Sequence, residues 1–155
     1  MKFLFVDDEN AYESPIAETL AYEAFNGTGH FVRAESRGLN VPEGKKKSNF
    51  TIYLLQSVDL PLEDDELDAI QITQEDIDNA DVVMTMTHEQ KYMLSQVCPA
   101  EKLFTVLEYM TGSNEDVISP KGSDLSAYRA CYYGFNKAFE TLANKWRSEH
   151  TEGEM

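Results

Sequence analysis

Four carboxylates follow a short apolar segment near the start of the chain, and they are the side chains best placed for chemistry. The four are Asp7, Asp8, Glu9 and Glu13. The preceding run, residues 2–6, is rich in β-forming residues and predicts a buried strand. Ser14 and Pro15 predict a helix start, with serine as the cap and proline at the first helical position. Backbone N–H groups at such a helix start favour an anion, whereas the side chains around them repel one.

Composition restricts the partners of the protein. The chain has 155 residues, with 28 acidic against 13 basic residues and a net charge of −15. We therefore expect no nucleic-acid or membrane partner, because both favour clustered Lys and Arg. A protein with a basic surface is the partner that this charge favours. Carboxylates also suit hard cations, so Mg²⁺ or Ca²⁺ held by Asp7 and Asp8 is the alternative to our expectation of no cofactor.

The length of the chain fits one domain, expected over residues 1–147, followed by a polar tail over residues 148–155. No apolar run reaches the length of a membrane span, and the N-terminus lacks the apolar core of a signal peptide. Cys98 and Cys131 form no disulfide framework, and we expect both to be small buried side chains. These features predict a cytoplasmic protein.

Alternating strands and helices are predicted along the chain. We expect helices over residues 15–25, 89–97 and 125–146, the last because apolar residues recur at three- and four-residue steps. Strands are expected over residues 31–35, 79–87 and 103–106, and Thr73 begins a further helix. The stretch 50–55 is open between a strand, from its β propensity, and a helix capped by Ser48.

The acidic stretch resembles the catalytic loop of the low-molecular-weight protein tyrosine phosphatases. That family has V-C-x-G-N-x-C-R-S-P-M-A-E after its first strand, and residues 6–18 here read V-D-D-E-N-A-Y-E-S-P-I-A-E. The matching residues are Val6, Asn10, Ser14, Pro15, Ala17 and Glu18. The nucleophilic cysteine of the family falls on Asp7, its glycine on Glu9, and its phosphate-binding arginine on Glu13.

Three later segments extend the resemblance. Residues 80–87 resemble the family strand A-D-L-I-L-x-M-T, and residues 107–113 resemble L-x-E-Y-x-T-G-S of the bacterial branch that includes protein arginine phosphatases. Residues 116–122 follow the pattern D-[VI]-x-D-P-[FY]-G, with Ser119 in place of the general-acid aspartate and Lys121 in place of the aromatic residue. The resemblance implies an α/β fold with a four-stranded parallel sheet and helices on both faces.

By the same resemblance, the family's catalytic positions are occupied by Asp7, Glu13 and Ser119, so its thiol chemistry is absent. We therefore predict a catalytically inactive family member, a pseudophosphatase, with a binding or regulatory role. The loop-binding candidates are Asp7, Asp8, Glu9, Asn10, Glu13 and Ser14. Two alternatives stay open: a metal-dependent hydrolase or cation-binding protein, and a family member with weak or no activity. We also hypothesise that a carboxylate of Asp7 or Glu13 folds inward and accepts the N–H bonds of the loop.

Overall fold

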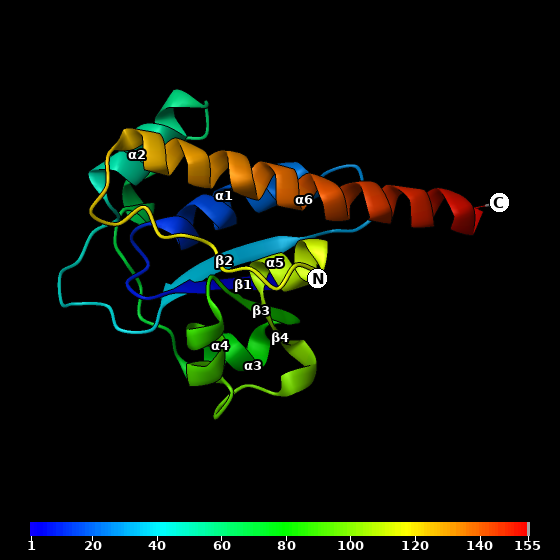
Figure 1. Cartoon of the computed structure of the whole chain (residues 1–155), viewed down its shortest axis with the longest axis horizontal. Coiled ribbons are helices and arrows are strands. Elements are labelled where there is room, and N and C mark those ends of the chain that lie inside the picture. Colours follow the sequence, from blue (N-terminus) through cyan, green and yellow to red (C-terminus); the bar gives the residue numbers. More distant parts are fainter. Residues whose placement is uncertain (155) are drawn as a thin grey trace.

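The structure, a computed structural model, describes the backbone of residues 1–154 and the side chains of residues 1–149. In this part of the chain, four parallel strands form one sheet in the order β2-β1-β3-β4. The strands are β1 (Lys2–Asp7), β2 (Arg33–Gly38), β3 (Val82–Thr85) and β4 (Leu103–Thr105). Helices cover both faces of the sheet (Figure 1). The expected fold class is confirmed.

The two faces of β1 are buried by different helices, because successive side chains of a strand point to opposite sides. Phe3 and Phe5 pack against α1 (Glu13–Phe25) and α6 (Leu125–Glu154), with the rings of Phe5 and Phe139 stacked 5.7 Å apart. Leu4 packs on the other face in a cluster supplied by α3 (Gln74–Asn79) and α4 (His88–Leu94). Strand β1 is therefore buried on both faces from Phe3 to its end at Asp7.

Shorter elements complete the chain. They are α2 (Asn49–Ser57), α5 (Val106–Thr111) and the 3-10 turns η1 (Asp64–Glu66) and η2 (Ala100–Lys102). The stretch left open between strand and helix is helical, because the Ser48 side chain accepts a hydrogen bond from the N–H of Thr51 at 3.3 Å and caps α2. Cys98 and Cys131 are buried free thiols, as expected.

Several element boundaries differ from the sequence prediction. The strand expected over residues 79–87 is β3, Val82–Thr85, and the helix expected over residues 89–97 is α4, which ends at Leu94. The strand expected over residues 31–35 begins at Arg33 and runs to Gly38, because these residues pair with β1 in register from Lys2 to Asp7. Phe31 lies before the strand and is 67% exposed. The last helix continues to Glu154, through most of the segment expected as a polar tail. Among the described residues, no helix combines the length and apolar character needed to cross a bilayer.

Candidate functional site

The acidic loop, residues 7–13, joins the end of β1 to the start of α1, and the carboxylate of Asp7 occupies its centre. One Asp7 oxygen accepts a hydrogen bond from the N–H of Asn10 at 2.6 Å, and the other accepts from the N–H of Ser14 at 3.0 Å. Asp7 is 1% exposed. The hypothesis that a carboxylate of the chain occupies the loop is therefore confirmed for Asp7.

Asn10 braces the loop from inside. Its side-chain amide donates to the hydroxyls of Ser14 at 3.1 Å and Ser36 at 2.9 Å, and its carbonyl oxygen accepts from the N–H of Ile70 at 2.8 Å. Its backbone has a φ of 55°, a conformation that asparagine tolerates better than most residues. Glu9, in the position of the family glycine, has no positive φ, so the turn of this loop is made by Asn10.

Gly38, the last residue of β2, allows the loop to approach the sheet. A Cβ at this position would lie 2.7 Å from the backbone N of Asn10 and 2.6 Å from a methyl carbon of Val41. The hydrogen bonds from the N–H of Leu39 to the carbonyl of Asp7, at 2.9 Å, and from the N–H of Asn40 to the carbonyl of Asp8, at 2.8 Å, hold the two segments together. A larger residue than glycine would push the loop off its support.

Glu13 is the second buried carboxyl group of the loop, and a distant segment holds it. The hydroxyl of Ser119 donates to the Glu13 carboxylate at 3.0 Å, although the two residues are 106 positions apart. Ser119 in turn accepts from the N–H of Lys121 at 3.2 Å. The segment that carries the family's general-acid position therefore lies against the loop, and its contact is with Glu13.

Burial raises the pKa of both carboxyl groups. It raises the pKa of Asp7 from the usual 3.8 to about 6, opposed by the hydrogen bonds from Ser14 and Asn10, which stabilise the charged form. For Glu13, burial and then the negative charge of Asp7 raise the pKa from 4.5 to about 8. Between these two values Asp7 is ionised and Glu13 keeps its proton. The loop then carries less negative charge inside than its sequence implies.

Two lysines lie at the rim of the acidic loop, and both contact the Tyr12 ring. The Lys121 ammonium contacts the Glu9 carboxylate at 2.6 Å and lies 5.7 Å from the centre of the Tyr12 ring. The Lys45 ammonium lies 5.5 Å from the same ring centre and 3.3 Å from the Tyr12 hydroxyl. These are cation–π distances. The mouth of the loop therefore presents positive charge above a buried acidic centre.

A small cavity, called here the Glu13 cavity, opens beside the loop and has a volume of about 170 Å³. It is lined by Asp8, Glu13, Thr87, Glu89, Gln90, Met93, Val117 and Ser119. Three of these side chains are carboxyl groups. While Glu13 keeps its proton, the carboxylates of Asp8 and Glu89 are the groups that favour a cationic ligand over a neutral one. The Asp8 carboxylate is oriented by the side-chain amide of Gln90, which donates to it at 3.0 Å.

The N-terminus of α1 keeps free hydrogen-bond donors. Among the described residues, the backbone N–H groups of Ala11 and Tyr12 have no hydrogen-bond partner. Tyr12 supplies no side-chain cap, and the first turn of the helix donates to Asp7 through the N–H of Ser14. Free N–H groups at a helix N-terminus bind anionic oxygens. The loop can therefore accept external oxygen atoms even though Asp7 already uses two of its donors.

The structure brings the predicted loop residues together but does not arrange them as a metal site. Both Asp7 oxygens accept N–H bonds, and Asp8 is turned towards Gln90. Within the described residues, no group of three or more His, Cys, Asp or Glu side chains is placed to hold a metal ion. Sequence reasoning missed Gln90 and the Lys45–Tyr12 contact, because no local pattern relates these residues to a loop far away in sequence.

Known proteins similar to this chain belong to one phosphatase family. The sequence profile of the family described as low molecular weight phosphotyrosine protein phosphatase matches residues 2–152. The protein-arginine-phosphatase of Bacillus subtilis is 26% identical over 151 residues, which cover 96% of this chain and 99% of that protein. The low molecular weight protein-tyrosine-phosphatase PtpB of Staphylococcus epidermidis is 32% identical over 133 residues, covering 85% of this chain and 89% of that protein.

Solved structures give the same result. An arginine phosphatase from Geobacillus stearothermophilus is 27% identical, with a TM-score of 0.83 and coverage of 97% of this chain and 96% of that chain. A mutant arginine phosphatase with a phosphorylated active-site serine is also 27% identical, with a TM-score of 0.83 and coverage of 94% of this chain and 95% of that chain.

These comparisons contradict the prediction of a catalytically inactive pseudophosphatase with a binding or regulatory role. Relatives that cover 85% or more of this chain are named as phosphatases of protein arginine or protein tyrosine. The prediction inferred inactivity from the loss of the cysteine, the arginine and the general-acid aspartate. Their loss removes thiol chemistry, but it leaves carboxylate chemistry available, because a carboxylate can also act as a nucleophile.

Proposed function

Because the chain belongs to the low molecular weight phosphotyrosine protein phosphatase family, we propose that it removes phosphoryl groups from protein side chains, with Asp7 as nucleophile and Glu13 as proton donor. One observation carries this proposal: two buried carboxyl groups on the acidic loop have pKa values on either side of neutrality. A pair whose pKa values are pushed apart has one member charged and the other protonated, as acid–base catalysis requires.

In the first step, an oxygen of the Asp7 carboxylate attacks phosphorus, and the bond from phosphorus to the leaving nitrogen or oxygen breaks. The proton on Glu13 goes to the leaving atom, and Asp7 becomes an aspartyl phosphate. In the second step, water attacks phosphorus while the Glu13 carboxylate takes its proton. The bond from phosphorus to Asp7 breaks, phosphate leaves, and both carboxyl groups return to their starting state.

The free N–H groups of Ala11 and Tyr12 and the ammonium groups of Lys45 and Lys121 would take the phosphoryl oxygens in place of an arginine. The proton on Glu13 removes the charge repulsion that its sequence position implies, since a neutral carboxyl group donates a hydrogen bond. A mutant relative with a phosphorylated active-site serine supports an oxygen nucleophile in this loop.

We propose phosphorylated arginine on a protein as the substrate. The Asp8 and Glu89 carboxylates of the Glu13 cavity suit a guanidinium leaving group, which carries positive charge and several N–H donors. Relatives named as protein-arginine-phosphatases support this choice. The protein partner expected from charge is then the substrate itself. We further propose the cytoplasm as its compartment, since Cys98 and Cys131 are free thiols.

The test measures phosphate release from a protein bearing phosphoarginine, a phosphotyrosine peptide and p-nitrophenyl phosphate. Asp7→Asn keeps the shape of the side chain but removes the nucleophile, and we expect a loss of roughly a millionfold in turnover. Glu13→Gln removes the proton donor, with an expected loss of about 100-fold or more. Asp65→Asn, at an exposed carboxylate, is the matched control and should retain full activity.

Mass spectrometry after an acid quench should find one phosphoryl group on the peptide that contains Asp7 in the wild type and none in Asp7→Asn. Absence of turnover by the wild type, or turnover unchanged in Asp7→Asn, would refute the proposal. Each assay is run with EDTA and again with added Mg²⁺ or Ca²⁺. Dependence of the turnover on a cation would support the other proposal made from the sequence, that Asp7 and Asp8 hold a metal ion.

A further inference from the structure

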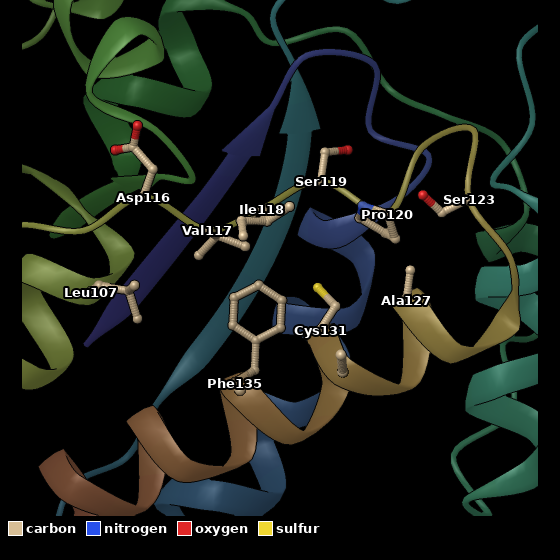
Figure 2. Close-up of a pocket in the computed structure, with 12 residues that line it drawn as sticks. Leu107, Asp116, Val117, Ile118, Ser119, Pro120, Ser123, Ala127, Cys131 and Phe135 are labelled. Atoms are coloured by element: carbon tan, nitrogen blue, oxygen red, sulfur yellow. The ribbon is translucent and has the colours of Figure 1, made fainter.

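A second hollow lies on the opposite side of the segment that carries Ser119. This hollow, called here the α6 groove, has a volume of about 360 Å³ and runs between residues 116–123 and the first half of α6. Figure 2 shows Cys131 and Phe135 pointing from the helix towards the segment, and Val117 and Pro120 among the residues that face them. Its lining is mainly apolar, and its volume lies in the range of ligand-binding pockets.

Small residues on α6 keep the groove open. Gly134 lies within the helix, where glycine is disfavoured, and a Cβ placed there would meet no atom within 4 Å. Ala127 and Ala130 line the same side. Ile118 extends the apolar surface at the rim and is 88% exposed. A Cβ at position 134 would clash with nothing, so local packing does not require the glycine.

The α6 groove and the Glu13 cavity share a wall. Val117 and Ser119 line both of them, and the hydroxyl of Ser119 donates to Glu13. A polypeptide with one side chain in the Glu13 cavity must therefore cross this wall, next to the opening of the groove. An extended peptide advances about 3.3 Å per residue, so a residue close in sequence reaches the other side.

We propose that the α6 groove binds an apolar side chain of the protein substrate, within three residues of the phosphorylated residue. This inference rests on the proposed function, because it uses that substrate as the occupant. Leu, Met and Phe are the side chains that the apolar lining favours. Acidic residues are disfavoured, since Asp116 lies at one end of the groove and the net charge of the chain is −15.

The experiment uses peptides with one phosphoarginine in a Gly/Ser background and a single leucine at each position from −3 to +3. Binding is measured by fluorescence anisotropy with the Asp7→Asn protein, which holds the peptide without turnover, and turnover is measured with the wild type. We expect leucine at one position to tighten binding about 10-fold, the gain typical of apolar groups in a hydrophobic pocket.

Gly134→Met fills the α6 groove. It should abolish the gain in affinity that leucine gives, while the affinity for the leucine-free peptide stays unchanged. Thr141→Met is the matched control, because it lies seven residues, or about 10 Å, further along the same face of α6 and outside the groove. It should keep the gain. Circular dichroism checks that each variant is folded. A photoreactive leucine at the preferred position should label the two walls of the groove, residues 116–123 and 127–135.

The outcomes separate the two proposals. A leucine gain that disappears in Gly134→Met supports the groove, even if the wild type turns over no peptide, which would refute only the proposed function. The proposed role of the α6 groove would be overturned if leucine at no position changed binding or turnover. It would also be overturned if the preference for leucine survived in Gly134→Met. Labelling confined to residues outside both 116–123 and 127–135 would overturn it as well, whether or not Gly134→Met folds.

Discussion

Replacing Glu13 by glutamine tests the electrostatics of the loop without reference to activity. Glutamine has nearly the same shape, and its amide oxygen can accept the same hydrogen bond from Ser119. The pKa of Glu13 is raised in the folded protein, so ionisation favours the unfolded chain. The stability contributed by the protonated group is present below about pH 4.5 and is lost as the pH rises through about 8.

The magnitude follows from the shift of the pKa from 4.5 to about 8. One pKa unit corresponds to about 1.4 kcal/mol, so ionising Glu13 in the folded state costs about 5 kcal/mol. Water entering the Glu13 cavity screens part of this cost, and we expect a net gain of about 3 kcal/mol for Glu13→Gln at about pH 9. At about pH 5 the same variant should gain less than about 1 kcal/mol, because the wild-type carboxyl group is still mostly protonated in the folded state.

Urea unfolding at both pH values measures these differences in the free energy of unfolding. Glu101→Gln, at an exposed glutamate, is the control and should stay within about 0.5 kcal/mol of the wild type at each pH. Equal effects of Glu13→Gln at the two pH values would show that the charge of Glu13 does not bear on stability. A Glu13→Gln variant that is less stable than the wild type at about pH 9 would refute the assignment of a raised pKa.

Three other predictions follow from the same region. The pH profile of kcat/KM should be bell-shaped, with apparent pKa values near 6 and 8, since Asp7 must be ionised and Glu13 protonated; a flat profile would contradict the mechanism. Asn10→Ala removes three side-chain hydrogen bonds and should cost about 3 kcal/mol in urea unfolding, and Asn10→Gly, which relieves the positive φ, should cost less. Gly38→Ala should cost about 1–3 kcal/mol from the clash with the loop, whereas Gly134→Ala, with open space around it, should be neutral or stabilising; equal thermal shifts would refute the close approach.

Local patterns in the sequence were enough to predict the platform of the site. The apolar run of β1 and the three- and four-residue spacing of apolar residues along α6 are local signals, and both elements begin where expected, although α6 continues past residue 146 to Glu154. Ser14 and Pro15 placed the helix start to within two residues. The conserved frame of the loop, with Asn10 at its centre, was visible as a family resemblance. Each of these features is decided by residues close together in the chain.

The protonation state of Glu13 and the long-range contacts of the acidic loop depend on how the chain packs when it is folded. A charge count treats Glu13 as negative, yet its pKa lies near 8, because the packed structure removes it from water next to Asp7. The contacts of Glu13 with Ser119 and of Asp8 with Gln90 join residues 106 and 82 positions apart. No local pattern contains such distances, and the pKa of a carboxyl group follows from its surroundings. The acidic loop was therefore recognisable from its residues, whereas the raised pKa values of its two buried carboxyl groups depend on burial in the folded protein.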